Sequence, residues 1–235
     1  VQTNILGSQN VINAAIDQKV KRVLLISSDK AAHPINLYGA TKLCAEKLFT
    51  SANGYAGERV KFSSVRYGNV IGSRGSIVET LLTSRNVKKV QITDKEMTRF
   101  WITLGQACEL VVFALENMVG GEIFVPKIPS MKLVHLFDAL APKAEKQIIG
   151  IRPGEKLHEV LLTEQESSHT IELEKYYVIM PEFLSPDQHR FNESKKYLKQ
   201  GKKMKSDSRY TSDTNKTLLT VADLQQMLKD KAKLI

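Results

Sequence analysis

The sequence is poor in cysteine and has no long apolar run. Cys44 and Cys108 each lie among apolar residues, with no second cysteine close by and no histidine at metal-ligand spacing. They therefore predict buried free thiols in a reducing compartment, which we take to be the cytoplasm. The longest apolar stretches, such as 110–115, are far shorter than the roughly 20 residues that a membrane span needs. We expect no membrane segment in this chain.

Acidic residues are absent from 195–205, where six of eleven positions are lysine within a chain of net charge +9. A surface that binds nucleic acid would interleave arginines and aromatic residues, and Tyr197 is the one aromatic residue there. We interpret the run as a solvated face, with nucleic acid or an acidic lipid surface as the alternative, and expect no nucleic-acid partner. Single, scattered histidines predict no metal site; they are His33, His135, His158, His169 and His189.

Strand-length apolar runs alternate with helix-period segments in the first third of the chain. The pattern predicts a helix over 5–16, a strand over 22–27, a loop over 29–36, a helix over 37–52, a strand over 61–67 and a glycine-bearing loop over 68–76. This alternation indicates right-handed crossovers and a parallel sheet covered by helices on both faces.

The pattern changes beyond residue 76. It predicts helices over 76–84, 105–117, 131–141, 157–162 and 221–229, and strands over 90–93, 99–103, 121–126 and 147–151. Residues 185–214 are polar and predict loops. This part reads as a smaller, mixed α/β region, from which 105–126 could return to the main sheet.

Tyr38 and Lys42 are the first residues whose spacing suggests chemistry. They lie four positions apart at the start of a helix and therefore share one face. A nearby ammonium group favours phenolate, so Tyr38 could remove a hydroxyl proton while a nicotinamide takes the hydride. Ser28 ends the preceding strand, at the carboxyl edge where parallel sheets bind ligands.

Several ordered motifs make the chain resemble a known family, the extended short-chain dehydrogenases, and within it the inverting 4,6-dehydratases of UDP-N-acetylglucosamine. The motifs are SSDKAAHPINLYGATKL, RYGNVIGSRGS, MTRFWIT, GGEIFVPKIPSMK and IRPGEKLHE. The resemblance implies an α/β fold, with 1–75 as the C-terminal half of a Rossmann-like, doubly wound NADP-binding domain and 76–235 as the substrate-binding region.

The resemblance also implies catalytic roles. Ser28, Tyr38 and Lys42 stand at the positions of the family's catalytic triad. In the resembling family the lysine at position 30 takes the proton from carbon 5, and the aspartate at position 29 assists departure of the hydroxyl from carbon 6. An ordinary exposed acid and base in a loop is the alternative for Asp29 and Lys30.

Binding residues follow from the same resemblance. The cofactor NADP is expected to contact Ser27, Tyr38, Lys42, Val70, Ile71, Gly72, Ser73, Arg74 and Ile77. The UDP-sugar is expected to contact Asn69, Thr93, Arg99, Arg152, Thr211, Ser212, Asp213 and Thr214. Guanidinium groups suit a diphosphate, although a surface salt bridge is the alternative for Arg99 and an ordinary polar loop the alternative for 211–214.

The sequence has no Gly-rich turn between a first strand and a helix, so the motif that binds the cofactor pyrophosphate is absent. We therefore expect that residues upstream are missing. Three other functions stay open: a retaining dehydratase, a UDP-sugar 4-epimerase, and a non-catalytic module that binds nucleotide sugars. The family resemblance also implies a homo-oligomer.

Overall fold

The computed structural model describes residues 1–57, 59–84, 87–181 and 188–232. Contacts divide the chain into two compact units. Unit 1 comprises Val1–Tyr67, Cys108–Lys127 and Val160–Tyr210, and unit 2 comprises Gly68–Ala107, Ile128–Glu159 and Thr211–Ile235. The chain returns to each unit after leaving it. One return is Cys108–Lys127, which overlaps the segment 105–126 that could return to the main sheet.

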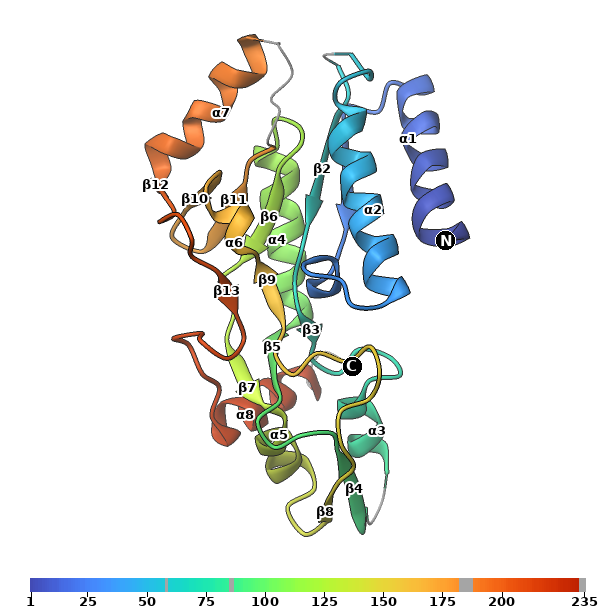
Figure 1. Ribbon diagram of the computed structural model, residues 1–235, viewed down its shortest axis with the longest axis vertical. Coiled ribbons are helices and arrows are strands. Elements are labelled where there is room, and N and C mark those ends of the chain that lie inside the picture. The colour runs from blue at the N-terminus through green and yellow to red at the C-terminus, as the bar shows by residue number, and fades with distance from the viewer. Residues whose placement is uncertain (58, 85–86, 182–187, 233–235) are drawn as a thin grey trace. The chain divides into compact units, whose positions relative to one another are not determined.

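Unit 1 is built on a six-stranded mixed sheet (Figure 1). Three neighbouring strands, β1 (Arg22–Ile26), β2 (Lys61–Val65) and β6 (Ile123–Pro126), run parallel. The sheet continues with β11 (Tyr176–Ile179), β10 (Thr170–Glu172) and β12 (Lys202–Lys203), which pair antiparallel. The expected parallel sheet is thus confirmed for its first three strands, while the antiparallel extension was not predicted.

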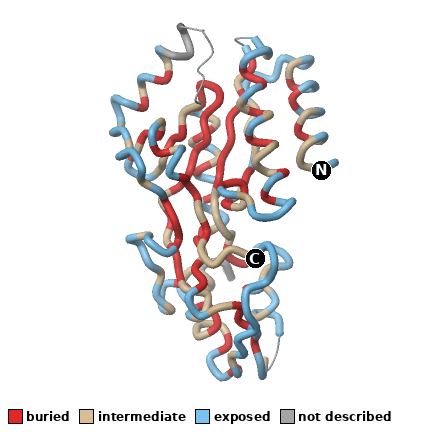
Figure 2. The backbone as a smooth tube through the Cα atoms, viewed as in Figure 1, coloured by how far each residue is buried: buried red, intermediate tan, exposed pale blue. Residues whose placement is uncertain are grey.

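Helices cover both faces of this sheet. Val23 and Leu25 of β1 pack into the cluster formed by α1 (Gly7–Asp17) and α2 (Leu37–Ala52). Leu24, between them, packs against the cluster that contains α4 (Leu104–Asn117). Alternate residues of a strand point to opposite faces, so α1 and α2 lie on one face and α4 on the other. Because both faces are covered, the central strands β2 and β6 are mostly buried (Figure 2).

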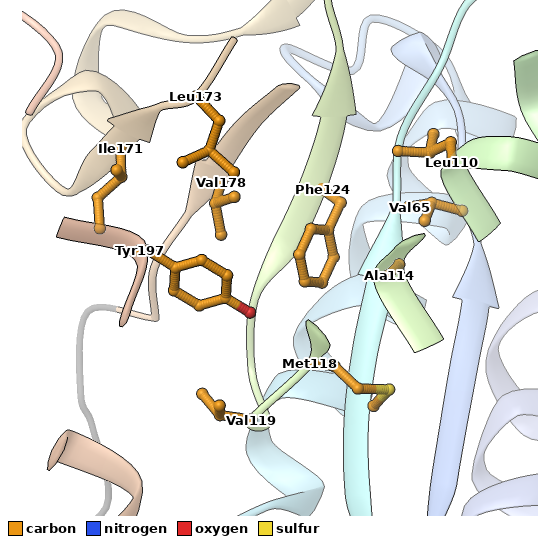
Figure 3. Packing of buried hydrophobic residues seen from close by; sticks show 10 residues of the cluster. All are labelled: Val65, Leu110, Ala114, Met118, Val119, Phe124, Ile171, Leu173, Val178 and Tyr197. Carbon is orange, nitrogen blue, oxygen red and sulfur yellow. The ribbon is translucent and has the colours of Figure 1, made fainter. Parts of the chain in front are cut away.

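Tyr197 anchors the helix α7 (Gln188–Gln200) to the core on the α4 side of the sheet. Its ring lies among Leu173, Val178 and Phe124 (Figure 3). The buried hydroxyl donates to the Asn117 carbonyl at 2.7 Å and lies 3.0 Å from Glu122 Oε1. An inward aromatic side chain therefore fixes a helix whose sequence is mostly polar.

The remaining short elements of unit 1 connect these layers. They are the π-helical turn η1 (Gln2–Leu6), the 3-10 turn η2 (Asp29–Ala31), α6 (Glu164–Ser167) and β9 (Val160–Leu162), while β13 (Tyr210–Thr211) lies where the chain leaves unit 1.

Unit 2 contains two small sheets and three helices. One sheet joins β3 (Asn69–Val70), β5 (Thr98–Ile102) and β7 (Ser130–Lys132), and the other joins β4 (Lys89–Ile92) and β8 (Glu145–Ile148). The helices are α3 (Ile77–Thr83), α5 (Leu133–Leu140) and α8 (Val221–Ala232). Trp101, Met131 and Leu136 are central to one core, and Ile92 and Phe137 to the other.

Two element predictions were wrong. Residues 157–162 form no helix but contain the strand β9, and 188–200, within the predicted loop, form α7; residues 185–187 lie outside the described part. The α/β class and the helix over 37–52 are confirmed. Among the described residues, no helix combines the length and apolar character needed to cross a bilayer.

Candidate functional site

Ser28, Asp29 and Lys30 form one hydrogen-bonded turn at the carboxyl end of β1. The Ser28 hydroxyl donates to Asp29 Oδ1 at 2.7 Å and accepts from the Lys30 backbone N–H at 3.3 Å. Lys30 Nζ lies 2.9 Å from the same Asp29 oxygen. The turn is fixed to the next strand because the Asp29 N–H donates to the Tyr67 carbonyl at 3.1 Å. These three predicted catalytic residues are therefore held together by direct contacts.

Two polar atoms beside this turn are buried without a partner among the described residues. They are Oδ2 of Asp29, whose side chain is fully buried, and the hydroxyl oxygen of Ser27. A buried carboxylate oxygen that accepts no hydrogen bond is energetically costly unless a ligand group completes it. Ser27 and Asp29 therefore mark a place where a polar ligand group would be stabilised.

The helix α2 begins directly beside this turn. Asn36 caps it by accepting from the Gly39 N–H at 2.8 Å. A Cβ on Gly39 would lie only 2.4 Å from the Lys30 carbonyl oxygen, so glycine permits the close approach of helix and turn. Tyr38, the residue before this glycine, is half exposed. The predicted base thus lies next to the Asp29–Lys30 turn with its side chain accessible.

Lys42, one helical turn after Tyr38, donates from Nζ to the Ile26 carbonyl at 3.1 Å. Burial lowers the pKa of this ammonium, and the Glu46 carboxylate partly offsets that decrease. All five predicted catalytic residues and Ser27 therefore belong to unit 1 and surround the carboxyl end of β1.

The sequence analysis missed a buried ion cluster behind Lys42. Arg66, directly after β2, is fully buried and uses all five of its N–H groups. They bond to Glu46 at 3.0 and 2.6 Å, to Glu166 at 3.0 and 2.9 Å, and to the Leu161 carbonyl at 3.1 Å. Burial alone would lower the pKa of Arg66, but the two carboxylates raise it. The position of Glu46, four residues after Lys42, was the available signal.

Unit 2 holds a hollow of about 540 Å³ lined by Arg152. The other lining residues are Ile77, Thr80, Leu81, Ser84, Val87, Lys89, Val90, Gln91 and Phe137. Arg152 is exposed, and the described part of the chain offers its guanidinium no hydrogen bond or ion pair. A hollow of this volume suits a small-molecule ligand, and Arg152 could supply it with paired donors.

Arg99 differs from Arg152 because its side chain is only 11% exposed and already bonded. NH1 donates to the carbonyls of Thr98 at 2.7 Å and Leu157 at 3.1 Å, and NH2 donates to that of Lys156 at 2.9 Å. Glu159 Oε1 lies 3.6 Å from its Nε. Arg99 is thus held mainly by backbone carbonyls inside the unit and is not a surface salt bridge. A diphosphate would have to displace these contacts.

Glu155 is a second residue that the sequence analysis missed. Its Oε1 accepts from the predicted substrate residue Thr93 at 3.4 Å and lies 3.7 Å from Arg99 NH2. Its Oε2 is buried without a partner among the described residues. The GEK triplet beside Arg152 was the signal that could have indicated this acceptor.

The predicted contacts 211–214 divide into buried and exposed residues. Ser212 is fully buried and its hydroxyl lies 2.6 Å from that of Thr98 and 2.9 Å from the Glu159 N–H, so it stabilises the unit. Thr211 is also buried and its hydroxyl lies 2.7 Å from that of Thr214. Asp213 is exposed; slight burial raises its pKa, but the hydrogen bond from Thr211 contributes to a net decrease. Asp213 and Thr214 remain the accessible candidates.

The predicted cofactor loop follows β3, which begins with Asn69 and pairs with β5. Ile71 is buried, whereas Ser73 and Arg74 are exposed. Gly72 has a φ of +66°, a conformation that other residues rarely adopt. Ile77 begins α3 and lines the hollow. These residues belong to unit 2 and include both buried and accessible positions.

Comparison with solved structures supports the fold. MoeE5 in complex with UDP-glucose and NAD matches 65% of this chain and 59% of its own with a TM-score of 0.57; at 16% identity, this likeness concerns the fold alone. The structure of Pen from Bacillus thuringiensis matches 99% of this chain and 69% of its own, with a TM-score of 0.85 and 37% identity. The fold is that of the extended short-chain dehydrogenases.

The chain belongs to the polysaccharide biosynthesis protein family, whose model matches residues 1–181. It is 48% identical over 218 residues to an inverting UDP-N-acetylglucosamine 4,6-dehydratase of Campylobacter jejuni, covering 92% of this chain and 65% of that relative. It is also 35% identical to a UDP-glucose 4-epimerase of Rickettsia rickettsii, over 98% of this chain and 70% of that relative. The chain thus spans about two thirds of the dehydratase that it matches.

Proposed function

We propose that the protein to which this chain belongs catalyses the NADP-dependent 4,6-dehydration of UDP-N-acetylglucosamine, with inversion at carbon 5. The observation that carries the proposal is the contact of Asp29 with Lys30 directly beside the helix start that bears Tyr38 and Lys42. The 48% identity to an inverting dehydratase supports the same reaction.

Two residues at the carboxyl end of β1, Ser27 and Lys42, fit a nicotinamide cofactor. The Ser27 hydroxyl, which has no partner among the described residues, can bond a polar group of such a ligand, and the Lys42 ammonium lies one turn from Tyr38. When bound, the nicotinamide would supply hydride chemistry: it would take a hydride from carbon 4, and that hydride would later return to carbon 6. We assign NADP rather than NAD from the family resemblance; mass spectrometry of the nucleotide released from the purified full-length protein tests this choice.

The chain's own residues then handle protons. Tyr38, as a phenolate that the Lys42 ammonium stabilises, takes the proton of the 4-hydroxyl and becomes a neutral phenol. Ser28 orients the oxygen on carbon 4. The ketone at carbon 4 acidifies the proton on carbon 5 for the following elimination.

Asp29 and Lys30 together supply the acid and base of that elimination. The Lys30 ammonium and the Asp29 carboxylate form an ion pair. Moving one proton from Lys30 to Asp29 across the 2.9 Å contact gives a second form, a neutral amine beside a carboxylic acid. In the second form Lys30 takes the carbon 5 proton while Asp29 gives its proton to the departing 6-hydroxyl. Water leaves, and the pair returns to ammonium and carboxylate. When the hydride returns to carbon 6, carbon 5 takes a proton on its opposite face, which inverts that carbon. This proton balances the one that Tyr38 took from the 4-hydroxyl, so the reaction closes when Tyr38 is a phenolate again.

The hollow at Arg152 suits the nucleotide end of the substrate. Its apolar and polar lining can contact a base and ribose. The Arg152 guanidinium, which has no hydrogen bond or ion pair within the described part of the chain, can hold the diphosphate in two parallel hydrogen bonds. We also propose that the enzyme works in the cytoplasm as a homo-oligomer, as its resemblance implies. Sedimentation of the full-length protein tests the assembly.

Incubation of the full-length enzyme with UDP-N-acetylglucosamine in heavy water tests the reaction. We expect NMR to show a 4-keto-6-deoxy sugar with deuterium at carbon 5 and couplings that report inversion. Lys30→Ala should abolish elimination while cofactor binding is retained. Unchanged turnover in that variant would exclude Lys30 as the base.

The same experiment decides the alternatives. The 35% identity to a 4-epimerase favours that reaction as the second candidate, but 4-epimerisation gives the Asp29–Lys30 pair no elimination to perform. An epimerase would invert carbon 4 without solvent deuterium at carbon 5. Retained configuration with deuterium would indicate a retaining dehydratase, and binding without any product a non-catalytic module.

A further inference from the structure

The cluster of Arg66, Glu46 and Glu166 carries a formal charge of −1, because one guanidinium faces two carboxylates. Glu46 and Arg66 have side chains only 1% exposed. A buried ion pair adds little stability over apolar residues of similar volume, and breaking one is strongly destabilising. A cluster with surplus negative charge therefore calls for a function beyond stability.

Glu46 lies on the same helix as Lys42, one turn later. Arg66 bonds both Glu46 carboxylate oxygens, at 3.0 and 2.6 Å, and so fixes that carboxylate. Glu166 bonds the other edge of Arg66 and is itself held by the capping box of Thr163. The negative charge beside Lys42 is thus held by a network with no unused guanidinium donor.

We propose that Glu46, fixed by Arg66, is a positioning residue for Lys42: its carboxylate keeps Lys42 an ammonium ion despite burial, and thereby keeps Tyr38 usable as the base. The inference rests on the proposed function for its catalytic consequence. The effects on the pKa of Lys42 have the direction that the inference requires. Burial lowers this pKa, and the Glu46 carboxylate raises it.

Other charged or titratable groups surround α2. Those on elements that pack against it are Asp17 on α1, Arg22 on β1, Asp29 and Lys30 on η2 and Lys61 on β2, and α2 itself carries Tyr38, Cys44 and Lys47. They stay unchanged in the variants below. A shift between variants therefore reports the removed charge.

The test compares Glu46→Gln with Glu166→Gln in the full-length enzyme. Each variant removes one carboxylate from Arg66, but only Glu46 lies on the helix of Lys42. For Glu46→Gln we expect the alkaline limb of the pH profile of kcat to move to lower pH by about one unit, because Lys42 loses its proton more readily. Glu166→Gln should leave the limb in place, and Glu46→Asp, which keeps the charge, should restore it.

A purely structural role would lower kcat by the same factor at every pH and leave the limb where it is, which would overturn the proposal. If Glu46→Gln does not fold, the triple variant Glu46→Met, Arg66→Met and Glu166→Gln removes the cluster without leaving a buried charge. The same limb shift is expected, and a folded triple variant with an unmoved limb counts against the proposal.

A second readout does not depend on the reaction. NMR titration of the reductively 13C-methylated protein, with Lys42→Arg to assign the signal, should show the Lys42 pKa about one unit lower in Glu46→Gln. If the wild-type protein has no dehydratase activity, the proposed function fails while this titration still decides whether Glu46 controls Lys42. An unchanged Lys42 pKa overturns the inference even in an active enzyme.

Discussion

Gly39→Ala tests whether the close approach of α2 to the Asp29–Lys30 turn matters for the reaction. The added Cβ would lie 2.4 Å from the Lys30 carbonyl oxygen and 3.1 Å from Pro34 Cβ. Ordinary contact begins at 3.4 Å, so the turn or the helix start must move by about 1 Å. The neighbouring atom is backbone and cannot rotate away.

Two opposing contributions set the stability of this variant. Overpacking costs about 1–3 kcal/mol, and alanine gains about 1 kcal/mol over glycine in a helix. We expect urea denaturation of the full-length enzyme to show a net loss of about 1 kcal/mol. A displacement of about 1 Å between base and substrate can reduce turnover about 100-fold, so kcat should fall far more than stability.

Gly7→Ala is the matched control. A Cβ at Gly7 would meet only the Gln2 carbonyl oxygen at 3.5 Å, an ordinary contact, and Gly7 has helical φ and ψ of −60° and −41°. We expect a gain of about 0.5 kcal/mol with unchanged kcat. The reasoning is refuted if Gly39→Ala is as stable as the Gly7 variant and turns over substrate at the wild-type rate.

Two further predictions follow from the arginines and from Glu166. Arg152→Ala should raise the Kd for UDP, measured by calorimetry, roughly 10- to 100-fold with little change in stability. Arg99→Ala should lose about 2 kcal/mol of unfolding free energy in urea denaturation, because three carbonyls lose their donor. Equal stability of the two variants would contradict this. Burial raises the pKa of Glu166, but Arg66 and Thr163 lower it by more than burial raises it. The pKa of Glu166 therefore lies below its ordinary value of 4.5. A depressed folded-state pKa gives stability that is present above 4.5 and lost as pH falls below it. The free energy of unfolding should therefore fall more steeply below pH 4.5 in the wild type than in Glu166→Gln, and parallel curves would refute this.

Local sequence was sufficient where local interactions decide the structure. The helix over 37–52 matches its prediction because Asn36 caps it and apolar residues recur at helical spacing. The predicted catalytic residues came as a set from the family resemblance, and the motif that carries it lies within consecutive residues 28–42. Its direct contacts, such as that of Lys30 with Asp29, join neighbours in the chain.

Long-range contacts explain what the sequence could not predict. Leu157 to Leu162 contain apolar residues at spacings compatible with a helix, but Glu159 exchanges hydrogen bonds with Ser212, 53 positions later, and the chain continues as a strand. The helix α7 has a narrow inner face that includes Ser194 and Tyr197, so its composition resembles a loop. The bonds from Arg66 to Glu166 span 100 positions, and no local pattern indicates them.

The division of unit 1 into three stretches of chain has a consequence for protein synthesis. β6 leaves the ribosome before β11 and β10, and the whole stretch Ile128–Glu159 of unit 2 comes between them. Until those strands emerge, one edge of β6 has no partner, and the core around Phe124 lacks Ile171, Val178 and Tyr197. Unpaired strand edges and exposed apolar surface promote aggregation of nascent chains. The helix α2, which bears Tyr38 and Lys42, is thus translated early, but the unit that supports it can be completed only when the chain has been made as far as Tyr210.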